Sequence, residues 1–460
     1  MIVTPFALIG LLLGLYLLFR GTTLDMFLLF LVATLFGGSA AVILAGLGGS
    51  SVPPGQFMLM FLALRFLLPG RAQMTALRQG IWDNRFLVIF TLYGALSALT
   101  LPILFAGTLA VTPLKPIPGR DLYAVEPLHL TGQNVTTAIY LFGTLIAGIG
   151  ARIAMARPGA PPLLVRTGVW IAWAHAMLGI VSVALAGTAG EVVFDVFRNG
   201  NYAQLNQSFG GLVRMNGVWP EPSGFAAYGA VWCIFMLELW FRDVASGRTG
   251  PAGGVLAVVL LASTSSTAYV SLGAYGLYAF LRHAFAPWGL AARKQLMFAA
   301  ALLGAGVLIL SLIVLVPSLA AYLWKLINLM TVDKVESASG LQRAFWARQG
   351  VGAFVASWGL GIGAGSFRSS SLITSIIGSM GIIGILSFLA HLLRSARLFS
   401  RETYSLRLPD RNGSIGAAAA TTAFVMLAPA SVAAPSPDPG LLWAAMCGIA
   451  LALHPAGRRT

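Results

Sequence analysis

Two polar stretches in a largely apolar chain carry the side chains best suited to chemistry. The first, residues 188–222, contains EVVFDVFRNGNYAQLNQSFGGLVRMNGVWPEP, and it places Arg214 and Glu221 just before a long apolar run. A guanidinium donates two parallel hydrogen bonds and therefore suits a diphosphate. The alternative interpretation is structural: Ser223 caps a helix that starts here, and Arg214 is an interfacial anchor.

The second stretch, residues 318–370, contains SASGLQRAFWARQGVGAFVASW. Helical spacing of Arg343, Trp346 and Gly350 predicts an amphipathic helix lying on the membrane. An interfacial helix with no further role is the alternative. Arg343 and Arg348 belong, however, to the side of the chain that is poor in positive charge, where guanidinium groups suit an anionic headgroup.

The segment GLGIGAGSFRSSS follows, with glycine at alternate positions from Gly359 to Gly365 and then Arg368. Such glycines allow close backbone approach to a ligand or to a neighbouring helix. The segment lacks the Lys-Ser/Thr ending of a P-loop.

Metal chemistry is not indicated by the remaining polar residues. The carboxylates of the same side form no DxD pair, and the five histidines show no ligand spacing, so we expect no metal or other cofactor. His175 lies within an apolar run, where an ionisable group is a functional hypothesis, although a neutral histidine hydrogen-bonded across helices is favoured. Glu238 is four residues from Arg242, and this spacing indicates a structural ion pair.

Composition determines the kind of element that must position these residues. Of the 460 residues, 58% are hydrophobic and 9% are charged, and apolar runs of bilayer-spanning length follow one another. The net charge of +15 does not indicate nucleic acid, because the basic residues lie in short loops between those runs. Cys233 and Cys447 both lie in apolar runs and form no disulfide framework. The N-terminal run is interpreted as a retained span.

The fold class predicted is an all-α polytopic transmembrane bundle of 12–13 spans in a single membrane domain, 1–460. The eighth and ninth spans are one apolar stretch interrupted by Ser263–Thr267, which predicts either a tight hairpin or one kinked helix. The spans are expected near 3–19, 25–48, 55–69, 84–107, 134–151, 167–187, 223–241, 253–264, 266–281, 295–317, 371–392, 413–432 and 440–456.

Orientation follows from the distribution of Lys and Arg. One set of alternate loops holds 19 of the 29 basic residues and the other set holds nine, while Arg65 lies within a span. The richer set is predicted to be cytoplasmic, with the C-terminus inside. The outer side then has the three longest polar stretches, 108–133, 188–222 and 318–370.

An ordered set of motifs resembles the O-antigen ligase and polymerase superfamily. The motifs are RMNGVWPEPSGFA from Arg214 to Ala226, STSSTA around Thr264, SGLQR, GLGIGAGSFR and IIGSMGIIG, within residues 130–400. The resemblance implies a metal-independent, inverting glycosyltransferase of GT-C type in the bacterial inner membrane. Its substrate would be an oligosaccharide on undecaprenyl diphosphate at the periplasmic face. A chain-length regulator and export machinery are the further partners implied.

The resemblance also implies roles for individual residues. Arg214 and Arg343 match the family arginines taken to hold the diphosphate, and Arg348 and Arg368 are additional candidates. Charge neutralisation by these groups would assist departure of the diphosphate. Candidate bases for the acceptor hydroxyl are Glu221, Glu336 and His129.

Three other interpretations stay open. A ligase transferring glycan to lipid A core is one, but ligases of the family carry a histidine in the large outer loop, and residues 318–370 contain none. A flippase of lipid-linked oligosaccharides would also use arginines, but should show paired halves and charges within spans. A scaffold subunit of an export machine would leave the outer arginines unconstrained.

Overall fold

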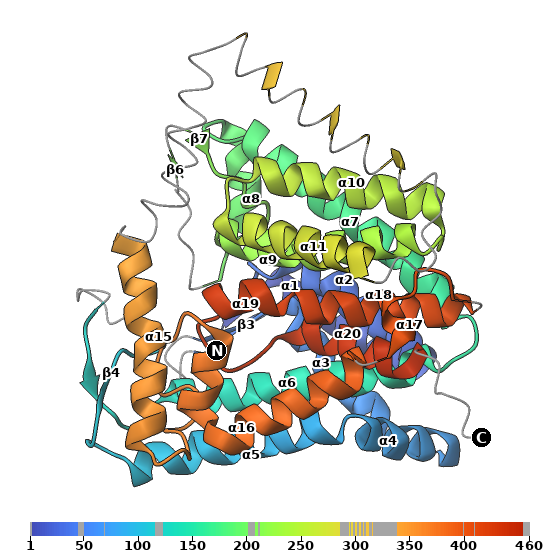
Figure 1. The fold of residues 1–460 in the computed structure, drawn as a ribbon. Coiled ribbons are helices and arrows are strands. Elements are labelled where there is room, and N and C mark those ends of the chain that lie inside the picture. Colours follow the sequence, from blue (N-terminus) through green and yellow to red (C-terminus); the bar gives the residue numbers. More distant parts are fainter. Residues whose placement is uncertain are drawn as a thin grey trace.

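The computed structural model describes residues 2–44, 50–68, 70–115, 123–200, 208–209, 212–285, 338–398, 400–408 and 410–453, with scattered positions from 294 to 315. These residues form a helical bundle with short strands at its edges (Figure 1). The predicted span at 295–317 lies largely outside the described residues.

The helices of the first half are α1 Pro5–Arg20, α2 Thr23–Ala33, α3 Pro54–Leu67, α4 Arg71–Asp83, α5 Arg85–Leu104, α6 Gly132–Met155, α7 Ala160–Ala184 and α8 Val192–Phe197. Those of the second half are α9 Pro222–Phe241, α10 Ser246–Ala262, α11 Ser266–Phe285, α15 Ala338–Ala356, α16 Leu372–Ala396, α17 Arg401–Tyr404, α18 Arg411–Val425, α19 Leu427–Ala433 and α20 Leu441–Leu453. Short 3₁₀ turns occur at Thr34–Phe36 and Ala189–Glu191.

The strands are short and antiparallel. Strand β2 (Val42–Leu44) pairs with both β1 (Ile2–Val3) and β3 (Ser50–Val52). Two hairpins complete the set, β4 (Ala110–Val111) with β5 (Glu126–Pro127), and β6 (Ser208–Phe209) with β7 (Leu212–Val213).

The length and composition of the helices match a multi-pass membrane protein. Among the described residues, six helical stretches are long and apolar enough to cross a bilayer, and four shorter apolar helices accompany them. The six are 85–104, 132–155, 160–184, 222–241, 372–396 and 411–433, and the shorter ones are 5–20, 23–36, 54–67 and 441–453. The predicted helical membrane bundle is therefore confirmed, while the total of 12–13 spans stays a prediction.

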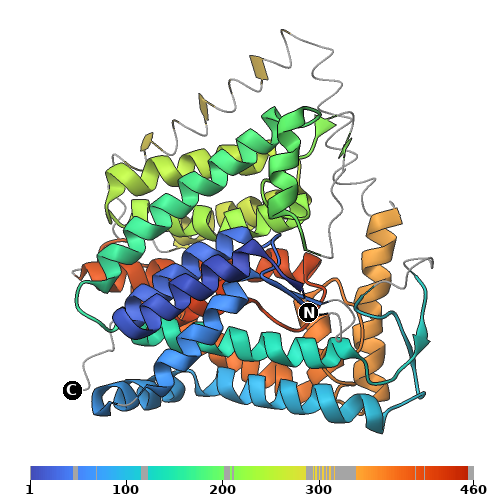
Figure 2. The same ribbon diagram turned by 180° about the vertical axis from the view of Figure 1, so that it is seen from behind.

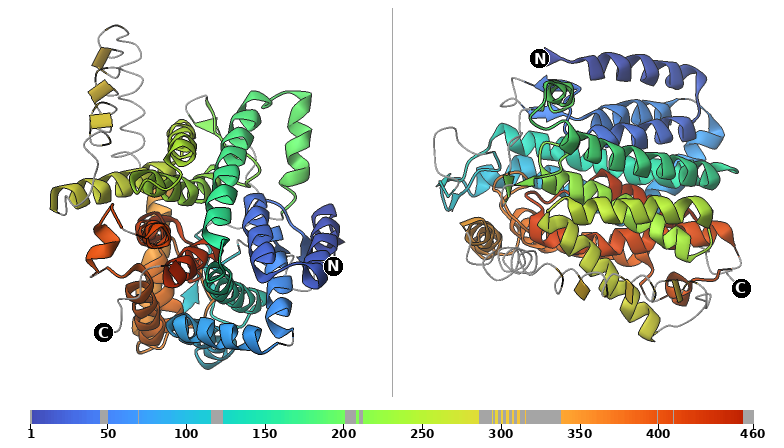
Figure 3. Two further views of the ribbon diagram at one scale, coloured as in Figure 1. Left: turned by 90° about the vertical axis from the view of Figure 1, so that its right-hand side faces the viewer. Right: turned by 90° about the horizontal axis from the view of Figure 1, so that it is seen from above.

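Most helices run side by side along one direction, and α15 crosses them at one end of the bundle (Figures 1 and 3). Helices α1, α2 and α3 lie together on the face seen in Figure 2. Helix α4 and the short helix α17 lie at the end opposite α15 (Figure 1). The crosswise placement of α15 agrees with the interfacial helix that its sequence predicts.

Loops that the charge distribution places on one side of the membrane do share one end of the bundle, which we name the arginine-rich end. There Asp83 binds Arg152, with Nε to Oδ2 at 2.8 Å, and Arg394, with Nη2 to Oδ1 at 3.2 Å. This carboxylate joins the end of α4 to the ends of α6 and α16. We name the end that carries α15 the arginine-poor end. Which end faces the cytoplasm stays a prediction.

The expected span at 25–48 is wrong in its second half. The helix ends with the 3₁₀ turn at Phe36, and strand β2 follows. A side chain at Gly37 would meet the Trp219 ring, because a Cβ there would lie 2.2 Å from a ring carbon. The sequence stays apolar beyond Phe36. The helix nevertheless ends there, because Gly37 and Gly38 let the backbone turn away beneath the Trp219 ring.

A second difference concerns the residues between the predicted spans at 55–69 and 84–107. No helix is predicted there, but the structure has α4. Its polar face carries Arg71 and Arg78, whereas Gly80 packs closely on Ile149 and Ile153 of α6. Amphipathic helices of this kind lie along an interface and escape a search for long apolar runs.

The interrupted eighth and ninth spans form a hairpin. Helix α10 runs antiparallel to α9, because the Cys233 thiol donates to the Gly253 carbonyl and a Cβ on Gly229 would touch Leu260. Helix α11 then returns parallel to α9, bringing Tyr275 beside Glu238. Thr264, at φ +52°, makes the turn at the arginine-poor end.

Helices α6 and α20 approach each other closely in the core. A Cβ on Gly448 would lie 2.2 Å from the Gly148 carbonyl oxygen and 2.8 Å from the Ala151 Cβ. Glycine at this position therefore lets the two backbones touch, the usual means of packing helices where no hydrophobic effect drives them together.

Gly448→Ala should destabilise the bundle by about 1–3 kcal/mol, because the added methyl forces α20 away from α6. A lower apparent melting temperature of the purified protein in detergent is the expected result. Gly276→Ala in α11 is the matched control, since a Cβ there meets nothing within 4 Å. Equal melting temperatures for the two variants would contradict the contact.

Candidate functional site

Arg214 lies at the arginine-poor end, beside the turn between α10 and α11. Its Nη2 donates to the Thr264 carbonyl at 3.3 Å. The turn exposes that carbonyl because Ser263, Thr264 and Ser265 interrupt the helix. Two motifs separated by fifty residues therefore meet.

The charge of Arg343 acts on Arg214 across two separate polar stretches. Partial burial lowers the pKa of the Arg214 guanidinium, and the Arg343 charge lowers it further, whereas Glu221 and Tyr269 act in the opposite direction. Electrostatic coupling of this kind requires proximity. Glu221 and Arg343 are thus the two residues selected from sequence whose charges act on Arg214.

Arg343 belongs to α15, and this helix packs along α16. The Ser370 hydroxyl donates to the Arg343 carbonyl at 2.6 Å. Gly350 allows the close approach, because a Cβ there would lie 2.2 Å from the Thr374 carbonyl oxygen. The helix predicted around Arg343 is therefore present, and it is fixed to the bundle rather than free on the surface.

The sequence left open whether the alternating glycines approach a ligand or a neighbouring helix. In the structure they pack against neighbouring helices. Each of Gly359, Gly361, Gly363 and Gly365 has φ between +81° and +101°. A Cβ on Gly361 would lie 2.5 Å from the Ser379 carbonyl oxygen. Only glycine fits these positions, because the conformation and the space both exclude a side chain.

This glycine segment also repairs a break in α16. The helix is interrupted at Gly381, with φ 57° and ψ −150°, which frees carbonyls of the preceding turn. Ile362 N donates to the Gly378 carbonyl and Gly363 N to the Ser379 carbonyl, both at 2.9 Å. Buried backbone groups must be paired, so the glycine segment and the break depend on each other.

The other side of the glycine segment is bound to the start of α6. Asn134 Nδ2 donates to the Ala364 carbonyl and to the Ser366 hydroxyl, both at 2.9 Å. The Asn134 side chain also accepts from the Thr131 amide at 2.9 Å, so one residue caps α6 and holds the glycine segment.

Arg368 connects the site to a third polar stretch, 108–133. Its guanidinium lies over the Trp346 ring at 4.6 Å from the centroid, and Nη1 donates to the Leu114 carbonyl at 3.3 Å. Nearby, Gln349 forms hydrogen bonds of 3.0 Å to both the amide and the hydroxyl of Thr112. The involvement of this stretch was missed from sequence, since it has no motif of its own.

Arg348 lies apart from the other arginines. It is exposed, and five residues along α15 place it about 140° around the helix from Arg343. The structure therefore does not bring Arg348 to the face that Arg343 occupies.

The candidate bases occupy different surroundings. Glu221 precedes α9 and accepts from the Ser223 hydroxyl at 3.0 Å, so Ser223 lies inside the helix and is not its N-cap, contrary to the structural alternative. His129 is exposed after β5, with Nδ1 2.8 Å from the Pro127 carbonyl oxygen. Glu336 lies outside the described residues.

Arg198 has a structural function that the sequence did not reveal. Its side chain is buried, lies over the Phe194 ring and donates to the Gly217 carbonyl and to Asn216 Oδ1. The bonds hold the turn that follows Arg214. The sequence does not predict this contact, because nothing in the spacing links Arg198 to Gly217.

His175 makes the hydrogen bond across helices that was favoured for it. Its Nε2 lies 3.0 Å from the Phe225 carbonyl oxygen, and its ring stacks on Phe225 with centroids 4.1 Å apart. The ring is fully buried between α7 and α9.

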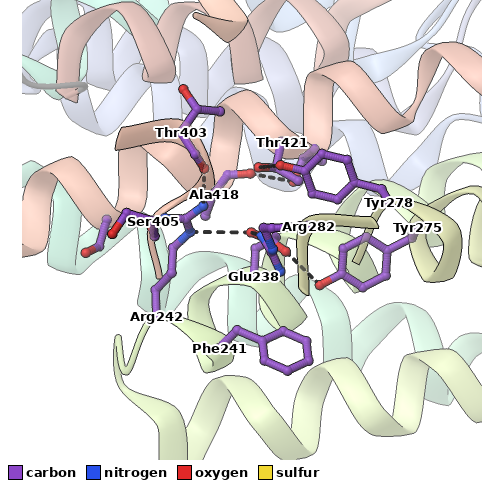
Figure 4. A network of polar contacts seen from close by, with 12 residues as sticks. Glu238, Phe241, Arg242, Tyr275, Tyr278, Arg282, Thr403, Ser405, Ala418 and Thr421 are labelled. Carbon is purple, nitrogen blue, oxygen red and sulfur yellow. Dashed lines mark hydrogen bonds and ion pairs between the residues drawn. The ribbon is translucent and has the colours of Figure 1, made fainter. Parts of the chain in front are cut away.

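Glu238 forms a larger network than the predicted pair, as Figure 4 shows. Its carboxylate accepts from Arg242 Nε at 3.3 Å, from Arg282 Nη1 at 2.7 Å and from the Tyr275 hydroxyl at 2.8 Å. Arg242 also donates to the carbonyls of Thr403 and Ser405. The network joins α9, α11 and α17 at the arginine-rich end, so it lies at the opposite end from Arg214.

Among the residues that the structure describes, no group of three or more His, Cys, Asp or Glu side chains is arranged to hold a metal ion. Comparison with family models, with curated proteins and with solved structures finds no match to this chain.

Glu238→Gln should destabilise the protein by about 3–5 kcal/mol, because two buried guanidiniums lose their counter-charge. Tyr275→Phe removes one hydrogen bond to the same carboxylate and should cost about 1 kcal/mol. Thermal unfolding in detergent measures both. Similar losses for the two variants would show that the charge of Glu238 is unimportant.

Proposed function

We propose that this protein is a metal-independent, inverting glycosyltransferase that polymerises oligosaccharide units carried on undecaprenyl diphosphate, at the periplasmic face of a bacterial inner membrane. The sequence motifs that resemble the O-antigen ligase and polymerase superfamily support this activity. The residues proposed to bind the diphosphate are Arg214 and Arg343, with Arg368 beside them.

The observation that carries the proposal is the placement of Arg214 and Arg343 at the arginine-poor end, where the Thr264 carbonyl binds the Arg214 guanidinium and the Ser370 hydroxyl binds the Arg343 backbone. The charge of Arg343 acts on Arg214, although the two residues are 129 positions apart in the sequence. Two like charges held close together oppose folding unless something offsets their repulsion. Glu221 offsets part of it at Arg214. A diphosphate carries the charge and the paired oxygen acceptors that two guanidiniums bind.

The reaction follows from that binding. An acceptor hydroxyl oxygen attacks the anomeric carbon of the donor sugar, and the bond from that carbon to the diphosphate oxygen breaks. The electron pair of the broken bond stays on the diphosphate, where the arginines neutralise the growing charge. The hydroxyl proton leaves to a base, for which Glu221 is the proposed residue because it lies beside Arg214.

The polymerase is proposed over the ligase because residues 318–370 lack the histidine that ligases of the family carry. The flippase is less well supported, because Arg214, Arg343 and Arg368 all lie at the arginine-poor end of the bundle. A transport path would need charges along the spans.

Arg214→Ala and Arg343→Ala should each abolish polymer while single lipid-linked units accumulate outside the cytoplasmic membrane, because the leaving diphosphate loses its counter-charge. The measurement is the lipid-linked product profile of a deletion strain that expresses each variant, with insertion verified by immunoblot of the membrane fraction.

Arg348→Ala is the matched control, since Arg348 is an exposed arginine on the same helix and is not part of the proposed site. It should make polymer at the wild-type level. Long polymer from Arg214→Ala would refute the diphosphate site. Units retained on the cytoplasmic face of the deletion strain would indicate a flippase, and long polymer not joined to lipid A core would indicate a ligase.

A further inference from the structure

The end of α2 and the starts of α3 and α20 lie beside the middle of α6. In each of these helices, this is the terminus nearer to the arginine-poor end. A Cβ on Gly55, near the start of α3, would lie 3.1 Å from Thr34 at the end of α2 and 3.6 Å from Leu441 at the start of α20. A Cβ on Gly143, in the middle of α6, would likewise touch the side chain of Gln56. Gly143 follows the start of α6 by eleven residues, which is about 17 Å of helix.

Irregular backbone therefore occupies a depth that helices fill elsewhere. Strands β2 and β3, which follow α2, and the residues 434–440 between α19 and α20 lie outside helices. Non-helical backbone at membrane depth is tolerated where it is buried in protein or faces water. A carboxylate, Asp438, stands in the second of these segments.

Within the described residues, hydrogen bonds reach Asp438 through one of its two carboxylate oxygens. Its Oδ1 accepts from the Thr144 hydroxyl at 2.7 Å and from the Gly440 amide at 3.0 Å. The side chain keeps part of its surface accessible. Within the described residues, the ion pairs to carboxylates involve Asp83, Glu238 and Asp243, and none involves Asp438. A carboxylate at this depth without a cationic partner requires other donors.

A polar stripe on α6 leads to this carboxylate. Gln133, Thr136, Tyr140 and Thr144 recur at intervals of three and four residues, which places them on one helix face. Strand β3 lies along the stripe, since the Tyr140 hydroxyl donates to the Ser51 carbonyl at 2.7 Å. Hydroxyl and amide groups in this density are unusual in a bundle of apolar helices.

The same segment touches the arginine site. Ser369 N donates to the Pro435 carbonyl at 3.0 Å, and the neighbouring Ser370 binds the Arg343 backbone. Asp438 is three positions after Pro435, a distance of at most about 11 Å along the chain. The carboxylate therefore lies within the reach of one oligosaccharide from Arg343.

We propose that Asp438, with Tyr140 and Thr144, forms the acceptor subsite, in which Oδ2 of Asp438 accepts a hydrogen bond from a sugar hydroxyl of the incoming glycan. The proposal rests on the proposed function and names the ligand of a second subsite. A carboxylate oxygen that is bound on one side and accessible on the other orients a hydroxyl strongly, because a charged acceptor strengthens the bond.

Two probes separate the subsites. The first is undecaprenyl diphosphate, and the second is the free repeat-unit oligosaccharide released by mild acid from the lipid-linked units of the deletion strain. Each is titrated into the purified full-length protein in detergent, and thermal stabilisation gives an apparent Kd. Asp438→Asn should weaken oligosaccharide binding by about 10–100-fold and leave undecaprenyl diphosphate binding unchanged.

Arg214→Ala provides the reciprocal control, with diphosphate binding lost and oligosaccharide binding retained. Asp438→Glu, which keeps the charge but shifts the oxygens, should weaken oligosaccharide binding less than Asp438→Asn. If Asp438→Asn does not insert, Asp438→Glu decides alone, because an unchanged oligosaccharide affinity then refutes the subsite.

Several results would overturn the proposal. They are equal oligosaccharide affinity in wild type and Asp438→Asn, no stabilisation of the wild type by oligosaccharide, or stabilisation by sodium chloride alone that disappears in Asp438→Asn. Failure of undecaprenyl diphosphate to stabilise the wild type would instead refute the proposed function. The two failures are therefore distinguishable.

Discussion

The break in α16 at Gly381 is the constraint on which the arginine-poor end depends. A helix that breaks inside a bundle leaves carbonyls without partners, and here the amides of Ile362 and Gly363 bind them. Those amides reach the break only because the glycines around them adopt positive φ and carry no side chain. The same segment is bound to Asn134 and leads into Arg368 and Ser370, so one repair of backbone hydrogen bonding positions both α15 and its arginine.

Charge is arranged differently at the two ends of the bundle. At the arginine-rich end, guanidiniums are neutralised by buried carboxylates, as Glu238 does for Arg242 and Arg282. At the arginine-poor end, Arg214 donates to a backbone carbonyl and is coupled to Arg343. A positive charge that is removed from water is costly unless a negative charge pairs with it. At the arginine-rich end, carboxylates of the protein itself provide that pairing.

Sequence reasoning predicted the helical membrane class and several of the elements correctly, because long apolar runs have few alternatives. It failed where backbone conformation decides. The run at 25–48 ends early because Gly37 lies beneath Trp219, and α4 was missed because its apolar face is narrow. Long-range hydrogen bonds from Arg198 and Asn134 were equally beyond reach, since no periodicity connects residues that are far apart in sequence.

The motifs and the geometry contribute different information about the site. The motif around Arg214 places a guanidinium before a helix, and only the fold shows that the Thr264 turn holds it. The glycine segment suggested a ligand contact, yet its neighbours are Ser379 and Gln133 of the bundle. Glycines that pack against helices fix the positions of the residues between and after them, and this is how a segment without a reactive group determines the geometry of a site. Asp438 illustrates the converse, because no motif surrounds it, and its depth beside Thr144 follows from three helices that end together.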